Sequence, residues 1–388
     1  MSTRPGSGRL RSIDILRGLA CVLMAIDHVR VYSGLPAGGP TPGIFFTRWV
    51  THFVAPAFCF LAGAAAFYHG RKLGDPKALT RFLVSRGAIL VLLEMTVIRV
   101  LWTFNLDFAH YLLAGVIWML GICMILLGGL TRLSPKAIGI FGLVVIFGQQ
   151  LIPLGFQALP ESVQAGTNWL FQFLYFGGLL SLGANGPTLA ILFSIVPWIG
   201  VMAVGYAFGT ILLREPDERR RWCLRIGLAA TAVFLVVAGG SVLATPAPPD
   251  APPALLRLLG QRKYPASELF LLMTLGPMIA AVPLAERLRG WLADALDLFG
   301  RVPMFYYLLH IPVIHLAAMA ASVIRAGRVD PWLFGNHPMM PPELPDGYQW
   351  SLGLLYLVLF LVLPVLYLAC RWYAGVKARH PNGWLRFL

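Results

Sequence analysis

The chain has 388 residues, of which 58% are hydrophobic and only 12% are charged, and its formal net charge is +14. A soluble globular domain carries about twice that fraction of charged residues. The composition therefore excludes an ordinary soluble protein and indicates an all-α, polytopic membrane protein, with a single membrane-embedded domain over residues 1–388. The five cysteines form no CxxC pair, so they indicate neither a disulfide framework nor a zinc site, and no metal is expected.

Apolar windows of about 20 residues, the length that crosses a bilayer, recur along the chain. They predict ten transmembrane helices, which cover residues 13–33, 50–69, 82–103, 108–129, 136–156, 188–213, 222–244, 265–285, 300–325 and 350–374. Residues 168–183 are apolar, short and rich in glycine, and we interpret them as an interfacial or re-entrant segment, with an eleventh span as the alternative. The expected fold is a membrane helical bundle.

Lysine and arginine residues are distributed unevenly between the two sides of this predicted bundle. One side, which includes both termini, holds 23 of the 31 basic residues. The other 8 are Arg30, Arg48, Arg99, Arg257, Arg262, Lys263, Arg325 and Arg328. Because basic residues favour cytoplasmic loops, the tails 1–12 and 375–388 are both predicted to be cytoplasmic. The net positive charge then reflects membrane topology, and no nucleic-acid partner is expected.

Ionisable side chains gather at or above the outer half of the predicted bundle. Such residues are costly at membrane depth and usually face a partner or a watery cavity. Histidines and carboxylates that converge at one level are what a proton-transfer site requires. The set comprises Asp27, His28, Arg30, His52, Glu94, Arg99, His110, Lys263, Tyr264, His310 and His315.

Several of these residues also have a purely structural interpretation. His52 and His110 begin predicted helices, where a solvated polar tip is ordinary. Glu94 and Arg99 are spaced to pair across slightly more than one helical turn. His310 lies nearer the middle of the membrane, where an uncompensated polar group is more costly, so a role in a site and a structural role are equally open for it.

The first span carries ionisable residues at both ends. Asp27 beside His28 can fix a tautomer or raise basicity, but adjacent helical residues point about 100° apart, so Asp27 can instead pair with Arg30. Asp14 and Arg17, three residues apart, fit an ordinary interfacial ion pair. Arg17 and His28 differ by only about 20° around the helix, so one face is predicted to line a path from a cytoplasmic anionic ligand to chemistry at His28.

Other common chemistries lack their motifs. The chain contains no GxxxxGK[ST], no HExxH and no GxSxG, which gives no support to ATP-driven transport, a zinc protease or a serine hydrolase. A transporter or channel, in which the same polar residues form a proton relay, is the alternative to an enzyme. A purely structural membrane protein would leave the intramembrane histidines and carboxylates unexplained.

Five stretches together resemble the bacterial branch of the heparan-α-glucosaminide N-acetyltransferase-like transmembrane acyltransferases. They are "RLRSIDILRGLACVLMAIDHVR" (9–30), "RWVTHFVAPAFCFLAGAAAF" (48–67), "VPWIGVMAVGYAFG" (196–209), "RKYPASELFLLMTLGP" (262–277) and "GRVPMFYYLLHIPVIH" (300–315). The resemblance implies an enzyme of the bacterial inner membrane that takes an acetyl group from cytoplasmic acetyl-CoA. It delivers this group to an amino sugar or glycan on the far side, with a buried catalytic histidine.

The resemblance also implies site residues, motif by motif. They are Asp14, Arg17 and Gly18 from "DxxRG", Asp27 and His28 from the end of the first span, His52 from "RWVTHFVAP", Lys263 and Tyr264 from "KYP", and His310 from "YYLLHIP". One departure matters: the lysosomal enzyme has its proposed catalytic histidine in the lumenal loop after the first span, whereas residues 34–51 contain none. The role then passes to His28 or His52, or this branch uses a different chemistry.

The mechanism expected from this resemblance centres on one histidine. His28, supported by Asp27, acts as general base on the acceptor's amine or hydroxyl, or accepts the acetyl group itself, and His52 or His310 stabilises the oxyanion. The expected substrate-binding residues are Asp14, Arg17, Arg30, Glu94, Arg99, His110, Lys263 and Tyr264. The expected partners are acetyl-CoA as donor substrate, the acceptor and membrane lipids; the acyl length and a homodimer are left open.

Overall fold

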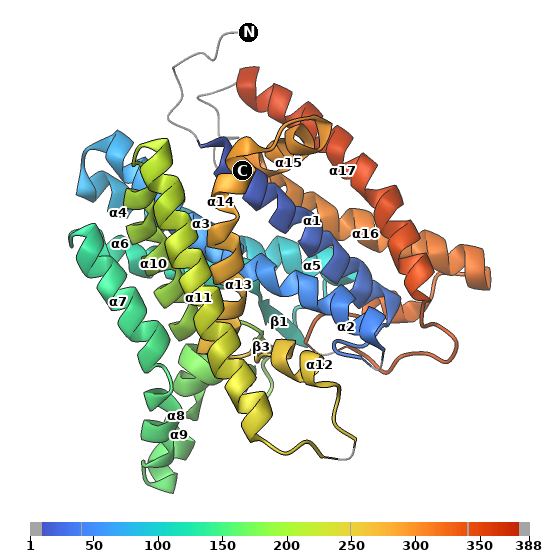
Figure 1. The fold of residues 1–388 in the computed structure, drawn as a ribbon. Coiled ribbons are helices and arrows are strands. Elements are labelled where there is room, and N and C mark those ends of the chain that lie inside the picture. Colours follow the sequence, from blue (N-terminus) through green and yellow to red (C-terminus); the bar gives the residue numbers. More distant parts are fainter. Residues whose placement is uncertain (1–9, 40, 249, 340, 380–388) are drawn as a thin grey trace.

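The computed structural model describes residues 10–39, 41–248, 250–339 and 341–379. This part of the chain is a bundle of helices with one small three-stranded sheet (Figure 1), which confirms the predicted all-α class. Residues 1–9 and 380–388, which hold most of the two predicted cytoplasmic tails, lie outside the described residues.

Five helices are long and apolar enough to cross a membrane. They are Pro42–Leu73 (α2 Pro42–Trp49, η1 Val50–Phe53 and α3 Val54–Leu73), α11 (Pro216–Ala244), Glu268–Arg287 (α13 Glu268–Ala280 and α14 Val282–Arg287), α16 (Pro303–Ala326) and α17 (Leu352–Arg379). Two helices bent by 52°, α7 (Pro135–Gly148) and α8 (Leu151–Gln157), pass the same test together. The chain is thus a polytopic membrane protein, and the count of ten spans stays a prediction.

The four remaining predicted spans also contain helices. The shorter apolar helices are α6 (Val116–Leu130) and α10 (Val196–Leu212). The first predicted span is α1 (Arg11–Ser33), which is 23 residues long and carries charged residues at both ends. The third consists of α4 (Pro76–Leu93), the π-helical turn η2 (Glu94–Ile98) and α5 (Arg99–Thr103).

The sheet corrects two of the predicted spans. Its strands are β1 (Tyr111–Ala114), β2 (Gly178–Ser181) and β3 (Thr188–Ile191), in the order β1-β3-β2, with β1 parallel and β2 antiparallel to β3. The segments 108–129 and 188–213, predicted as continuous helices, therefore each begin as a strand. A four-residue apolar strand cannot be distinguished by periodicity from the first turn of an apolar helix.

Residues 168–183 do not form one continuous helix, so the alternative of an eleventh span has no helix there, and the interfacial or re-entrant interpretation stays a prediction. They run from the end of α9 (Glu161–Phe171) through the π-helical turn η3 (Gln172–Phe176) into β2. The short helices α12 (Ala254–Leu259) and α15 (Trp291–Arg301) and the 3-10 turn η4 (Pro331–Phe334) were also not predicted.

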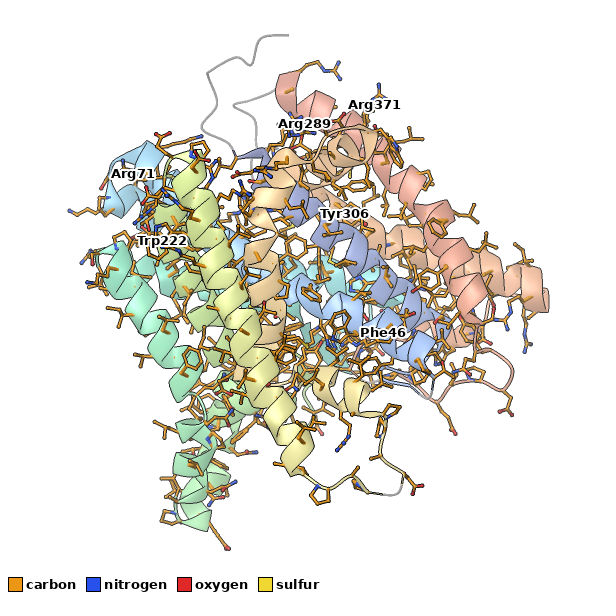
Figure 2. All side chains as sticks on the ribbon, in the orientation of Figure 1. Phe46, Arg71, Trp222, Arg289, Tyr306 and Arg371 are labelled. Carbon is orange, nitrogen blue, oxygen red and sulfur yellow. The ribbon has the colours of Figure 1, made fainter. Side chains whose placement is uncertain are left out.

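The helix α1 begins and α17 ends at the same end of the bundle (Figure 1). Figure 2 shows Arg71, Arg289 and Arg371 at that end, whereas Phe46 lies toward the other. We call the end with these arginines the basic end and the other the sheet end, because β1 and β3 lie toward it. These three arginines belong to the 23 basic residues that the sequence analysis assigns to one side.

Helix α1 lies unusually close to α15, and Gly18 permits this approach. A Cβ atom built on Gly18 would lie 1.8 Å from the backbone oxygen of Leu296, and one on Gly300 would lie 1.8 Å from the backbone oxygen of Asp14. Side chains larger than glycine are excluded at both positions, because a backbone oxygen cannot rotate away. This contact gives the glycine of the "DxxRG" motif a physical role.

We expect Gly18→Ala to destabilise the protein by about 1–3 kcal/mol or more, the typical cost of overpacking. Thermal unfolding in detergent should show a lower Tm than the native protein. The matched control is Gly129→Ala in α6, because no atom lies within 4 Å of a Cβ built there. An unchanged Tm for Gly18→Ala would contradict the close packing of α1 on α15.

Candidate active site

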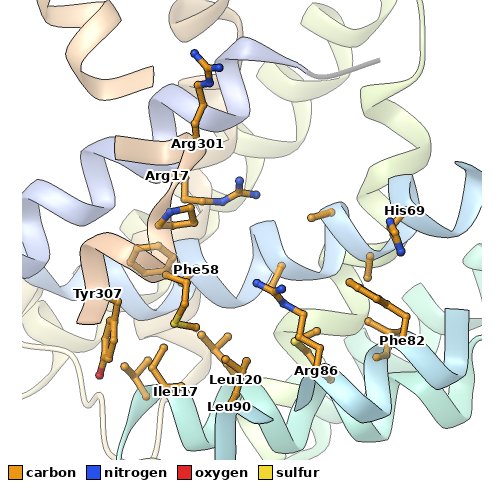
Figure 3. Close-up of a pocket in the computed structure, with 18 of the residues that line it drawn as sticks. Arg17, Phe58, His69, Phe82, Arg86, Leu90, Ile117, Leu120, Arg301 and Tyr307 are labelled. Atoms are coloured by element: carbon orange, nitrogen blue, oxygen red, sulfur yellow. The ribbon is translucent and has the colours of Figure 1, made fainter. Parts of the chain in front are cut away.

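Two large cavities lie along α1. The first, which we call the basic cavity, has a volume of about 500 Å³ and is lined by residues that include Arg17, His69, Arg86, Arg301 and Lys377. Figure 3 shows Arg17 and Arg86 reaching toward the middle of this cavity from α1 and α4. The remaining lining is mainly apolar, from α3, α4, α6 and α16.

The second cavity lies nearer the sheet end and has a volume of about 390 Å³. We call it the histidine cavity, because His28 lines it. Leu113 of β1, Gly178 of β2 and Ile191 of β3 also line it, so the small sheet forms part of its wall. Val116 and Tyr307 line both cavities, which therefore meet at these two side chains.

Helix α1 contributes residues to both cavities. Arg17 lines the basic cavity and His28 the histidine cavity. Their eleven-residue separation corresponds to about 16 Å along the helix axis. Arg17 also donates to Asp14 at 3.2 Å and to the backbone oxygen of Gly300 at 3.3 Å, so the predicted Asp14–Arg17 ion pair is present as well.

His28 is held by a second histidine rather than by its sequence neighbour. Its Nδ1 lies 2.6 Å from Nε2 of His310, and the imidazole packs edge-on against Trp102 with ring centroids 4.7 Å apart. His310 is fully buried in α16. Its Nδ1 lies 2.6 Å from the backbone oxygen of Tyr307 and 3.1 Å from that of Tyr306.

These contacts assign the tautomers of the two neutral histidines. A carbonyl oxygen only accepts, so Nδ1 of His310 must carry its proton and Nε2 must be the acceptor. His28 then donates through Nδ1, which leaves its Nε2 unprotonated. That nitrogen has the lone pair that a general base or a nucleophile needs. Both nitrogens of His310 are engaged, so the expected role of His310 in stabilising an oxyanion does not fit this geometry.

Asp27 pairs with two arginines and does not support His28. Nε of Arg30 donates to Asp27 Oδ1 at 3.0 Å, and Nη1 of Arg48 donates to Oδ2 at 2.8 Å. The alternative pairing of Asp27 with Arg30 is therefore the one that the structure contains. Asp27 does not contact His28 because the side chains of adjacent helical residues point about 100° apart.

Lys263 and Tyr264 join this charged group from the loop before α13. Both line the histidine cavity together with Arg48, and the Lys263 ammonium lies 5.2 Å from the centroid of the Tyr264 ring. Burial, together with repulsion from Arg48, lowers the pKa of Lys263 below its ordinary value. Burial alone would raise the pKa of Tyr264, but the neighbouring Lys263 and Arg48 outweigh it and lower that pKa.

Glu94 caps a helix and lines the histidine cavity. Its Oε2 accepts hydrogen bonds from the backbone N–H groups of Ile117 and Trp118, at 2.9 and 3.2 Å, in the first turn of α6. Its Oε1 is buried without a hydrogen-bond partner among the described residues. Glu94 thus lies next to Val116, where the two cavities meet.

The structure does not bring Arg99, His110 or His52 into the described lining of either cavity. Arg99 is fully buried and donates hydrogen bonds to the backbone oxygens of Tyr111, Asn105 and Asp107. In the described part of the chain, it forms no ion pair with Glu94 within 4 Å. His110 is exposed, pairs with Asp107 and precedes β1 instead of opening a helix. His52 lies edge-on to Phe270, 5.4 Å between ring centroids.

Several lining residues were missed from the sequence. Arg48 was assigned only to topology, although it opens the quoted block "RWVTHFVAP". Arg86 lies inside a predicted span, and an intramembrane charge is by itself a signal of function. Tyr307 has no such signal, because an aromatic residue in an apolar helix is ordinary. Over the residues that the structure describes, no group of three or more potential ligands is placed to hold a metal ion.

Comparison with known proteins identifies the family. No curated protein matches the chain. The model of the family described as heparan-alpha-glucosaminide N-acetyltransferase, catalytic, matches residues 9–244, which is more than half of the 388 residues. The match includes Arg17, His28 and Glu94, whereas Lys263 and His310 lie beyond it. The resemblance seen in the sequence is confirmed, and the chain belongs to the heparan-α-glucosaminide N-acetyltransferase family.

Proposed function

We propose that the protein is a membrane-embedded acyltransferase that moves an acetyl group from acetyl-CoA to an amino sugar or glycan on the other side of the membrane. The observation that carries this proposal is the placement of His28. His28 has an unprotonated Nε2 and lines the histidine cavity. This cavity meets the basic cavity at Tyr307 and Val116. A donor and an acceptor can thus approach one histidine from opposite ends of the bundle.

The basic cavity is suited to the donor. Coenzyme A carries phosphate groups, and guanidinium groups are strong phosphate ligands. Arg17, Arg86 and Arg301 line this cavity together with Lys377. The positive-inside rule supports a cytoplasmic location for the basic end, on the side where acetyl-CoA is made, and the resemblance to bacterial members supports the inner membrane. The thioester would then reach the histidine cavity past Tyr307.

The chemistry follows from the tautomer of His28. The acceptor nitrogen or oxygen attacks the thioester carbon, and His28 Nε2 takes its proton as the new bond forms. The carbon–sulfur bond then breaks, and the proton passes from His28 to the departing sulfur. The products are the acetylated acceptor and free CoA. Glu94 Oε1, the free oxygen beside Val116, accepts a hydrogen bond from the acceptor or from an amide of the donor.

The expected alternative, an acetylated His28, uses the same contacts differently. His28 Nε2 attacks the thioester carbon, and its Nδ1 proton moves to His310 Nε2 so that the acetylated ring is neutral. The acceptor then attacks this acetyl group, His28 recovers the proton from His310, and the acceptor's proton goes to the CoA thiolate. The two routes differ in whether His310 must take a proton.

The direct test is CoA release from acetyl-CoA by the purified protein, offered a panel of amino sugars and glycans. We expect release only when an acceptor is present, with stoichiometric acetylated product by mass spectrometry. Absence of release on every acceptor would contradict the proposal. Gradient-driven solute uptake into sealed vesicles by the same preparation would then favour a transporter.

The basic cavity gives a separate prediction for the donor. Replacing Arg86 with glutamine should raise the KM for acetyl-CoA by about 10-fold or more, since a hydrogen bond to a charged group contributes about 1.5–3 kcal/mol. The KM for the acceptor should change little, because Arg86 lines the basic cavity only. A variant with unchanged donor KM and altered acceptor KM would show that the cavities are assigned the wrong way round.

A further inference from the structure

The histidine cavity has one strongly positive wall. Arg30, Arg48 and Lys263 line it, and each is only 8% exposed. The only carboxylate that pairs with this group among the described residues is Asp27, which binds both arginines. Three buried cations therefore face one anion. This wall is distinct from the basic cavity, which lies toward the other end of α1.

Lys263 is the cation that lacks an acidic partner. No carboxylate lies within 4 Å of its Nζ in the described part of the chain. The ammonium instead lies 5.7 Å from the ring centroid of Phe193 and 5.2 Å from that of Tyr264. The other carboxylate of the cavity, Glu94, is engaged with the first turn of α6 and forms no ion pair with this wall.

An excess of buried positive charge is costly unless an anion balances it. Removing a charge from water costs several kcal/mol, and a counter-charge with hydrogen bonds is what recovers it. Asp27 balances one of the three cations. The rest of the lining is mostly apolar or backbone and supplies no further anion to this wall. The net positive charge of this wall therefore favours binding of an anionic ligand.

We propose that the acceptor carries an oxyanion group, a carboxylate or a phosphate, which binds at Lys263, Arg48 and Tyr264 while its nucleophile faces His28. This inference rests on the proposed function, since it names the class of acceptor for the same site. Arg48 and Lys263 supply N–H donors, and the hydroxyl of Tyr264, which lines the same cavity, supplies a third donor. A neutral amino sugar would leave this wall unpaired.

The experiment measures binding, so that it does not depend on turnover. The full chain in neutral detergent is titrated with glucosamine, glucosamine 6-phosphate, muramic acid and inorganic phosphate. We expect the two acidic sugars to bind about 10-fold or more tightly than glucosamine, the range of a charge-assisted hydrogen bond. Lys263→Met should remove this preference, and Lys263→Arg should keep it. The matched control is Lys136→Met, an exposed lysine at the start of α7.

Any one of four results would overturn the inference. The first is that the acidic sugars bind no more tightly than glucosamine. The second is that their advantage over glucosamine survives in Lys263→Met. The third is that inorganic phosphate alone binds as tightly as glucosamine 6-phosphate, which would make the positive wall a site for a free anion. The fourth is that nanodiscs of phosphatidylglycerol, but not of phosphatidylcholine, abolish the tighter binding of the acidic sugars. A lipid headgroup would then be the group that binds at the positive wall. Tight binding without acetyl transfer would contradict the proposed function alone, and transfer without charge preference would contradict this inference alone.

Discussion

Replacing His28 with phenylalanine is expected to lower kcat for CoA release by about 10²–10⁴-fold, the range that a positioned general base contributes. Phenylalanine keeps a ring against Trp102 and His310 but has no nitrogen to take the acceptor's proton. The loss should appear in kcat, and the KM for acetyl-CoA should change little, because we propose that the donor's phosphates bind in the basic cavity, which His28 does not line.

The matched control is His315→Phe in α16. His315 is also fully buried, and its imidazole stacks between Tyr32 and Phe104, with ring centroids 4.7 and 4.1 Å away. It lies outside the described lining of both cavities, so phenylalanine should preserve packing and turnover. Equal losses in the two variants would point to a general loss of structure. Full turnover in His28→Phe would move the chemistry to another residue.

Much of the helical fold could be predicted from the sequence, because a bilayer imposes a minimum length on every apolar helix. The segments that became α11, α16 and α17 are long enough for this rule to identify them. The sheet could not be predicted in this way. Each of its strands has four residues, and pairing between residues 111–114 and 188–191 depends on contacts that local periodicity does not encode.

The candidate site was predicted in composition but not in its contacts. Depth in the membrane follows from position along a span, so His28, Lys263 and His310 could be placed at a similar level. Which of them touch depends on how the helices turn and pack, and His310 lies 282 residues from His28. The adjacent pair Asp27–His28 was misleading for the same reason. Neighbours along a helix diverge, whereas neighbours across helices meet.

The pair His28–His310 makes it possible to separate the two chemical routes. We expect His310→Leu to lower kcat by about 10²-fold or more, because loss of the partner frees His28 to adopt the wrong tautomer; loss of the right tautomer costs the serine proteases about 10⁴-fold. His310→Gln should retain much of the activity, since its amide oxygen can still accept the Nδ1 proton of His28 in a hydrogen bond.

Glutamine can accept that hydrogen bond but cannot take the proton. On the general-base route, His28 becomes an imidazolium that keeps its Nδ1 proton, so an acceptor beside it is sufficient. On the acetyl-histidine route, the Nδ1 proton must leave before the ring becomes neutral, so glutamine should be as inactive as leucine. The ¹⁵N chemical shifts of labelled histidine measure the tautomer of His28 independently of turnover. Nε2 of His28 should be unprotonated in the native protein and in His310→Gln, whereas His310→Leu should show a mixture of the two tautomers. Equal inactivity of both variants, with the His28 tautomer preserved in His310→Gln, would therefore assign His310 as the proton acceptor and His28 as the acetyl carrier.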